Sequence, residues 1–144
     1  MSTFTGTFHL AIPINDIAKA KAFYVEALGC QVGRESAQAM ILNFGGHQVV
    51  AHMTPTPLTP QKGIYPRHFG LIFDDHRNWQ ACLTQAQDHQ LTFREPARTR
   101  FQGEITEHST FFLEDPFYNL LEFKHYAHPE AVFGAQAMAE VGDR

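Results

Sequence analysis

The chain has 144 residues with 15 acidic and 11 basic side chains, and therefore a formal net charge of −4. This length fits one domain, or two small halves that share one core, and the 44% hydrophobic residues suffice for that core. The mild acidity argues against nucleic acid and an anionic membrane surface as partners, and no apolar run approaches the roughly 18 residues of a membrane span.

The first half, about residues 7–53, begins with a short apolar strand from His9. Asn15 or Asp16 is then a plausible N-cap for a helix whose apolar residues recur at spacings of three and four, with Gly29 just past its end. Three strands are expected after it, at Cys30–Glu35, Met40–Phe44 and Gln48–Met53. This half therefore reads as β-α-β-β-β.

A linker is predicted over residues 54–66, because four of the eight prolines fall in or beside it. The second half, about residues 67–126, repeats the pattern of the first: a strand from His68, an N-cap at Asp74 or Asp75, a helix, and three strands. Those strands are expected at Leu91–Arg94, Ser109–Leu113 and Asn119–Tyr126. The tail, residues 127–144, is expected to form a short helix or to fray.

The two halves align at an offset of 59 residues, which places His9 over His68 and Asp16 over Asp75. A half of this size buries too little apolar surface alone, so the two modules should pair into one unit. The predicted fold class is α+β, with two paired βαβββ modules forming a curved mixed-sheet cup in a single domain over residues 1–144.

Three polar side chains fall on the strand faces that point away from the predicted helices: His9, His68 and Glu122. Taken singly, a strand histidine is more often a hydrogen-bonded filler than a ligand, and a strand glutamate beside a lysine is usually solvated or ion-paired. Together, two imidazoles and one carboxylate can occupy one face of an octahedral ion. We therefore predict a metal site of His9, His68 and Glu122.

The chain resembles the vicinal oxygen chelate superfamily, which includes glyoxalase I, bleomycin resistance proteins and extradiol dioxygenases. The matching pieces are FHLAIPINDIAKAKAFYVEALG, RHFGLIFDD, and the run from Asp115 to Glu122, which is similar to the family pattern D-P-x-G-N-x-x-E with Tyr118 in place of glycine. The resemblance covers about residues 7–126. It implies the same three ligands, His9, His68 and Glu122.

The resemblance also bears on the reaction. Aligning HQVVAHM with YNLLEFKHY puts Ala51 where glyoxalase I has a fourth, glutamate ligand, so a three-ligand, dioxygenase-like site is favoured. Against this, family dioxygenases have a tyrosine where this chain has Phe112. Candidate catalytic groups are His52, which needs a bulge to turn inward, and Tyr126, which shares the face of Glu122.

Arg94, Arg98 and Arg100 cluster in a predicted loop. They could hold a substrate carboxylate, although a solvated charged loop is the favoured interpretation.

The sequence thus predicts a metal-dependent enzyme that chelates a small substrate through two neighbouring oxygens. Fe²⁺ is the favoured ion, with Mn²⁺, Zn²⁺ or Ni²⁺ as alternatives. The rival hypotheses are a glyoxalase-like isomerase or lyase, and a metal-free protein that sequesters a small aromatic compound. No signal peptide is recognised, which makes the cytoplasm the expected location, and the resemblance implies a homodimer.

Overall fold

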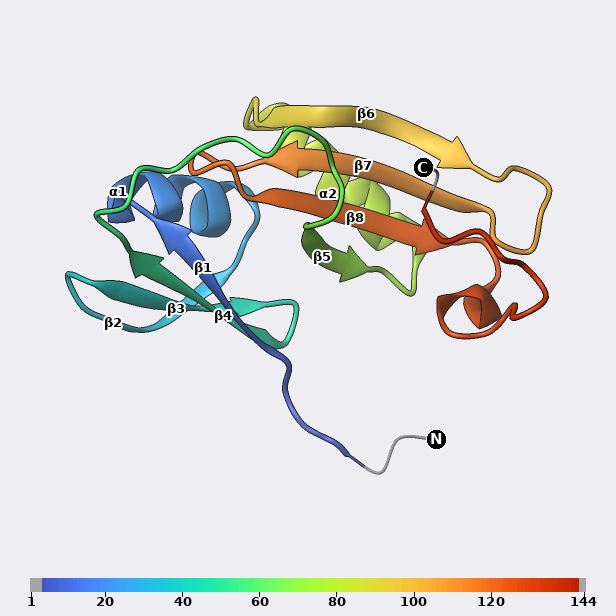
Figure 1. Ribbon diagram of the computed structural model, residues 1–144, viewed down its shortest axis with the longest axis horizontal. Coiled ribbons are helices and arrows are strands. Elements are labelled where there is room, and N and C mark those ends of the chain that lie inside the picture. The colour runs from blue at the N-terminus through green and yellow to red at the C-terminus, as the bar shows by residue number, and fades with distance from the viewer. Residues whose placement is uncertain (1–3, 143–144) are drawn as a thin grey trace.

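The computed structural model describes residues 4–142 (Figure 1). The first module contains β1 (His9–Ile14), α1 (Ile17–Ala20) continued by the π-helix η1 (Lys21–Ala27), β2 (Gln31–Glu35), β3 (Ala39–Phe44) and β4 (His47–Met53). The second contains β5 (Phe69–Ile72), α2 (His76–Asp88), β6 (Thr92–Arg100), β7 (His108–Glu114) and β8 (Leu120–Tyr126), followed by the short 3₁₀-helix η2 (Pro129–Val132). The predicted β-α-β-β-β repeat is confirmed.

Each module forms its own four-stranded mixed sheet. The strand orders are β1-β4-β3-β2 and β5-β8-β7-β6, and the first pair in each order is parallel while the others are antiparallel. The two modules lie next to each other in Figure 1. The identical strand orders confirm the predicted α+β class of two paired modules.

The two helices begin at the predicted caps. Asp16 accepts a hydrogen bond from the Lys19 backbone N–H at 3.0 Å, and Asp75 accepts one from the Arg77 backbone N–H at 2.7 Å. These side chains satisfy N–H groups that have no partner within the helix.

The larger of two apolar clusters joins the modules. Ile14 of β1, Phe44 of β3 and Phe123 of β8 belong to one cluster of buried side chains. The Phe44 ring lies between the second module's Phe69 and Phe123, at centroid distances of 5.8 and 6.0 Å. Neither module could keep this apolar surface from water by itself, so the two modules bury it against each other.

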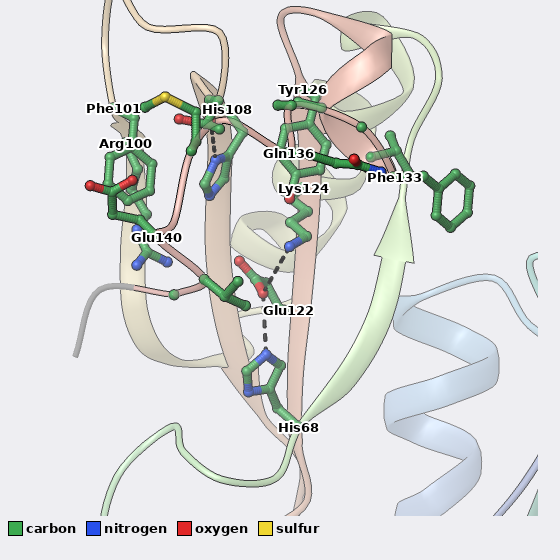
Figure 2. A pocket seen from close by; sticks show the side chains of 18 of the residues that line it. His68, Arg100, Phe101, His108, Glu122, Lys124, Tyr126, Phe133, Gln136 and Glu140 are labelled. Atoms are coloured by element: carbon green, nitrogen blue, oxygen red, sulfur yellow. Dashed lines mark hydrogen bonds and ion pairs between the residues drawn. The ribbon is translucent and has the colours of Figure 1, made fainter.

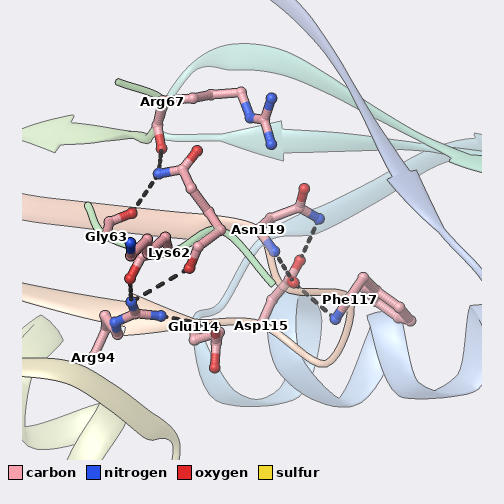
Figure 3. A network of polar contacts seen from close by, with 9 residues as sticks. Lys62, Gly63, Arg67, Arg94, Glu114, Asp115, Phe117 and Asn119 are labelled. Atoms are coloured by element: carbon pink, nitrogen blue, oxygen red, sulfur yellow. Dashed lines mark hydrogen bonds and ion pairs between the residues drawn. The ribbon is translucent and has the colours of Figure 1, made fainter. Parts of the chain in front are cut away.

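A buried polar contact also joins the modules. The Tyr24 hydroxyl of η1 donates to Asp115 Oδ2 at 2.6 Å, and Asp115 also accepts from the backbone N–H groups of Phe117 and Asn119 (Figure 3). Tyr118, which replaces the family glycine, adopts a left-handed φ of 68° in this turn. The turn before β8 therefore keeps the conformation that glycine would adopt, at a modest steric cost.

The predicted arginine loop is wrong, because all three arginines lie on β6, which runs to Arg100. Arg94 donates to the Lys62 carbonyl at 2.6 Å and lies 3.4 Å from the Glu114 carboxylate, holding the linker against the sheet (Figure 3). Arg98 lies on the same strand, 3.5 Å from Glu95. Only Arg100 is buried.

No helix within residues 4–142 is long and apolar enough to cross a membrane.

Candidate active site

Two of the three predicted ligands meet on the second sheet. His68 precedes β5 and Glu122 lies on the adjacent β8, and His68 Nε2 is 3.3 Å from Glu122 Oε1 (Figure 2). The Glu122 carboxylate is buried, and its other oxygen accepts a hydrogen bond from the Thr110 hydroxyl at 2.6 Å. Lys124 Nζ lies 3.8 Å from Oε1. The carboxylate is therefore fixed in place by groups on three sides.

The hydrogen bonds of His68 select its tautomer. Its Nδ1 lies 2.7 Å from the Ile64 carbonyl oxygen, which can only accept, so Nδ1 carries the proton. The lone pair of the neutral ring then sits on Nε2, which faces Glu122. Metal-binding histidines characteristically donate their second ring N–H to a carbonyl or carboxylate in this way.

The pKa values of this pair shift in opposite directions. The hydrogen bond to Glu122 raises the pKa of His68 above its ordinary 6.5, although burial opposes that shift. Burial acts to raise the pKa of Glu122, but the hydrogen bonds from His68 and Thr110 and the charge of Lys124 outweigh it, so the pKa falls below 4.5. The metal-free pair therefore favours a charged imidazolium and carboxylate.

This pair predicts a stability optimum in weakly acidic solution. The contribution of His68 is fully present below about pH 6.5 and is lost as pH rises through its raised pKa. The contribution of Glu122 is present above about pH 4.5 and is lost as pH falls through its lowered pKa. The free energy of unfolding can be measured with urea on metal-free protein from pH 4 to 8. The wild-type value should exceed that of His68→Gln by the largest amount between these two pH limits. A difference that does not vary with pH would contradict the pairing.

The site fits a divalent ion. Two ligands at about 2.1 Å on adjacent positions of an octahedral ion lie roughly 3 Å apart, close to the 3.3 Å between His68 Nε2 and Glu122 Oε1. The donors are an imidazole nitrogen and a carboxylate oxygen, which suit Fe²⁺, Mn²⁺ and Zn²⁺. The chain therefore places two donor atoms of suitable chemistry side by side here.

The third predicted ligand, His9, lies on β1 of the other sheet. Its side chain is exposed, and its Nδ1 lies 2.7 Å from Gln48 Oε1, an oxygen that can only accept, so Nδ1 carries the proton as in His68. Among residues 4–142, no three His, Cys, Asp or Glu side chains of one chain are grouped closely enough to hold a metal. One chain thus brings His68 and Glu122 together but does not bring His9 to them.

The strand register corrects the alignment of β4. Ala11 pairs with Val50 in the first module, as Gly70 pairs with Glu122 in the second, so Val50 rather than Ala51 is the counterpart of Glu122. Ala51 is fully buried in the core. Val50 has no carboxylate either, so β4 still supplies no counterpart to the Glu122 side chain.

The register also shows where His52 lies, and β4 has no bulge that would turn this residue inward. His52 pairs with Pro13, two residues along β1 from Ala11, so it shares the strand face of His9. It is exposed on the first sheet and does not line the cavity beside Glu122. Its catalytic role stays a prediction.

A cavity of about 460 Å³ lies beside His68 and Glu122 on the second sheet. Tyr126, the other predicted catalytic group, lines it, as do Lys124, His108 and Arg100 (Figure 2). Residues 131–142 of the C-terminal segment contribute much of the remaining wall.

His108 is not among the site residues predicted from the sequence. It is buried on β7, and its Nδ1 lies 2.9 Å from the Thr106 carbonyl oxygen, so Nε2 is the unprotonated nitrogen of the neutral ring. Burial, and then the charges of Lys124 and Arg100, lower the pKa of His108. A neutral imidazole in this cavity can accept a proton.

Gly70 permits the close approach of β5 to β8. A Cβ at this position would collide with the carbonyl oxygen of Glu122. We expect Gly70→Ala to force the strands apart, to lower the free energy of unfolding by about 1–3 kcal/mol, and to separate His68 from Glu122. Gly63→Ala is the control for urea unfolding, since nothing lies within 4 Å of that Cβ. Equal stability of the two variants would refute this role.

The fold and these residues define a class: paired βαβββ modules with a histidine at the first strand of each and a carboxylate on the last. The chain belongs to the Glyoxalase/Bleomycin resistance protein/Dioxygenase superfamily, whose model matches residues 6–123. This confirms the resemblance to the vicinal oxygen chelate superfamily. Among curated proteins, none matches the chain.

Solved structures agree with this assignment. A glyoxalase/bleomycin resistance protein/dioxygenase from Alicyclobacillus acidocaldarius is 39% identical, with a TM-score of 0.83 over 89% of this chain and 96% of that one. The fosfomycin resistance protein FosX from Listeria monocytogenes shares the fold at 16% identity and TM-score 0.69, over 90% and 99% of the two chains. Lactoylglutathione lyase from Agrobacterium tumefaciens does so at 15% and 0.65, over 86% and 96%.

Proposed function

We propose that this protein is a metal-dependent enzyme that binds a small substrate through two neighbouring oxygens, with His68 and Glu122 as ligands of the ion. The observation that carries the proposal is the orientation of His68, whose Nδ1 is engaged by the Ile64 carbonyl while Nε2 faces the buried Glu122 carboxylate. The Thr110 hydroxyl holds the other oxygen of this carboxylate, so both donor atoms are oriented before an ion binds.

The third ligand in this proposal is His9 of a second copy of the chain. His9 is exposed, and its unprotonated Nε2 lies on the open face of the first sheet. A homodimer that sets the first sheet of one copy against the second sheet of the other would complete two equivalent sites. His52 shares the face of His9 and would approach the same sites.

The divalent ion would supply Lewis acidity to the chelated substrate oxygens. The protein's part is to orient the ligands through Ile64 and Thr110, and to hold the reacting groups in a partly enclosed cavity. His108 and Tyr126 line that cavity and are placed to accept or donate protons.

Dioxygenase chemistry is the preferred reaction type. Two histidines and one carboxylate are typical of Fe(II) oxygenases, and Val50 provides no fourth ligand. Residue 112 is a phenylalanine whose ring lies against the His68 ring at a centroid distance of 5.0 Å. It has no hydroxyl group to do the work of the tyrosine that family dioxygenases have at this position. His108 and Tyr126 would then carry the proton transfers.

Subunit mixing tests the shared site. His9→Ala and Glu122→Gln should each bind little metal as homodimers, because each removes a ligand from both sites. After the two variants are unfolded and refolded together, about a quarter of the wild-type number of sites should return, all in heterodimers. Recovery would support ligands from two chains. No recovery, or full metal binding by either variant alone, would overturn the proposal.

The reaction type needs a separate assay. Protein loaded anaerobically with Fe(II) should take up oxygen when it is mixed with members of a panel of catechols. A parallel assay measures hemithioacetal isomerisation by protein loaded with Ni²⁺ or Zn²⁺. Isomerisation without oxygen uptake would identify a lyase. Tight binding of an aromatic compound that is independent of metal, with neither activity, would identify a sequestering protein.

A further inference from the structure

Two histidines lie together on the face of the second sheet that is opposite to the cavity beside Glu122. His76 is the first residue of α2, which packs against β8, and His125 lies on β8 (Figure 1). Their ring centroids are 5.4 Å apart, with the ring planes inclined at 74°. His125 directly follows Lys124, which lines the cavity, so alternation along the strand turns His125 to the other face. The pair is therefore separate from the candidate active site.

The backbone fixes the ring of His125. Its Nδ1 lies 2.9 Å from the carbonyl oxygen of Phe73, which can only accept, so Nδ1 carries the proton and Nε2 is the unprotonated nitrogen of the neutral ring. Phe73 is itself held to β8, because its N–H donates to the Lys124 carbonyl at 2.7 Å. A carbonyl that accepts from one ring nitrogen in this way orients the other nitrogen as a metal ligand.

His76 is exposed but lies against a fixed wall. Its ring packs on the Trp79 indole at a centroid distance of 5.4 Å, with 34° between the planes. Trp79 is buried, and its indole N–H donates to the Phe123 carbonyl at 2.9 Å. The indole, three residues further along the same helix, therefore supports the His76 ring beside His125.

The charges next to the pair are compatible with a bound cation. Asp74 and Asp75 directly precede His76 in the chain. The guanidinium of Arg77, which follows His76, lies 3.7 Å from the Asp75 carboxylate, so its positive charge is compensated.

The separation of the two rings fits one shared ion. In a tetrahedral site the imidazole nitrogen lies about 2.1 Å from the ion, which puts the ion about 3.2 Å from the ring centre. Two such rings have centres roughly 5 Å apart, close to the observed 5.4 Å. We propose that His76 and His125 bind a divalent transition-metal ion of the class that favours imidazole nitrogen, which is Cu²⁺, Ni²⁺ or Zn²⁺. This second site does not rest on the proposed function.

Trp79 reports on this site, because it is the single tryptophan of the chain and an ion bound to His76 would lie within about 9 Å of its ring centre. Cu²⁺ quenches tryptophan fluorescence at such distances. The parent protein for the titration is Glu122→Gln, which lacks a ligand of the candidate active site. We expect saturable quenching by Cu²⁺ with one ion per chain. A large excess of Zn²⁺ should reverse it, whereas Mg²⁺, which prefers oxygen ligands, should not.

Further substitutions in this parent locate the ion. His76→Gln and His125→Gln should each lose the saturable quenching, because one imidazole alone forms no chelate. His89→Gln is the matched control, since His89 is an exposed histidine at the other end of α2 and its variant should be quenched like the parent. If His125→Gln fails to fold, His76→Gln decides, because the His76 side chain is exposed.

Four results would overturn this metal site. Three of them are quenching that is unchanged in His76→Gln, equal loss in His89→Gln, and reversal by Mg²⁺ as effective as reversal by Zn²⁺. The fourth is saturable quenching in wild type that is absent from Glu122→Gln, because that result would assign the ion to the candidate active site. Quenching that depends on His76 and His125 would sustain the proposal even if Glu122 binds no metal.

Discussion

Glu122→Gln is expected to abolish stable metal binding while leaving the fold intact. Glutamine keeps the size of the side chain and can still accept from Thr110, but it removes the negative charge that holds a divalent ion beside His68. The loss should exceed the about 10- to 100-fold that removal of a supporting residue costs. Metal content after dialysis, and competition with a chelating indicator, measure it.

Glu114→Gln is the matched control for this substitution. Glu114 also lies at a strand of the second sheet, but its carboxylate pairs with Arg94 and does not line the cavity. It should retain wild-type metal affinity. Equal affinity of wild type and Glu122→Gln would refute the ligand assignment, and equal loss in both variants would point to a general effect of charge.

The fold was predictable from the sequence because it depends on local patterns that repeat. The two strand-helix units share a histidine, an acidic N-cap and an amphipathic helix at one offset, and each cap forms as expected at Asp16 and Asp75. Strand alternation then correctly placed Glu122, Lys124 and Tyr126 on one face of β8. These inferences need only the periodicity of one element at a time.

The pairing register between strands could not be predicted from patterns within single elements. Alternation says that Ala51 and His52 face opposite ways, but only the pairing of β1 with β4 shows that Ala51 enters the core and His52 shares the face of His9. A one-residue error in aligning two strands reverses every side chain. This is why an alignment of β4 with β8 by composition selected Ala51 rather than Val50.

Arg100 was named as a candidate from the sequence, but its buried place on β6 was not predicted, for a related reason. The pairing of β6 with β7 shifts register twice, between Phe93 and Glu95 and again between Glu95 and Arg98. Each shift breaks the alternation of side chains, so the face of Arg100 cannot be counted from Arg94. The same irregular pairing hid the position of His108, which lies opposite Arg100.

The second large expected effect on metal affinity comes from Thr110, which holds the Glu122 carboxylate in place. Thr110 is 1% exposed, and its hydroxyl donates to Glu122 Oε2 at 2.6 Å, on the carboxylate oxygen that does not face His68. Thr110→Val replaces this hydroxyl by a methyl group of similar size, so packing is preserved while the donor is lost. The carboxylate can then rotate away from His68, and we expect metal affinity to fall by about 10- to 100-fold.

Thr110→Ser separates this hydrogen bond from the packing of the side chain. Serine keeps the hydroxyl and loses the methyl group, so its metal affinity should stay near that of wild type even though its free energy of unfolding is lowered by about 1 kcal/mol. Metal titration and urea unfolding of the same three proteins distinguish the two effects. If Thr110→Val binds metal like wild type, or if the serine variant loses as much affinity as the valine variant, the hydroxyl does not orient Glu122.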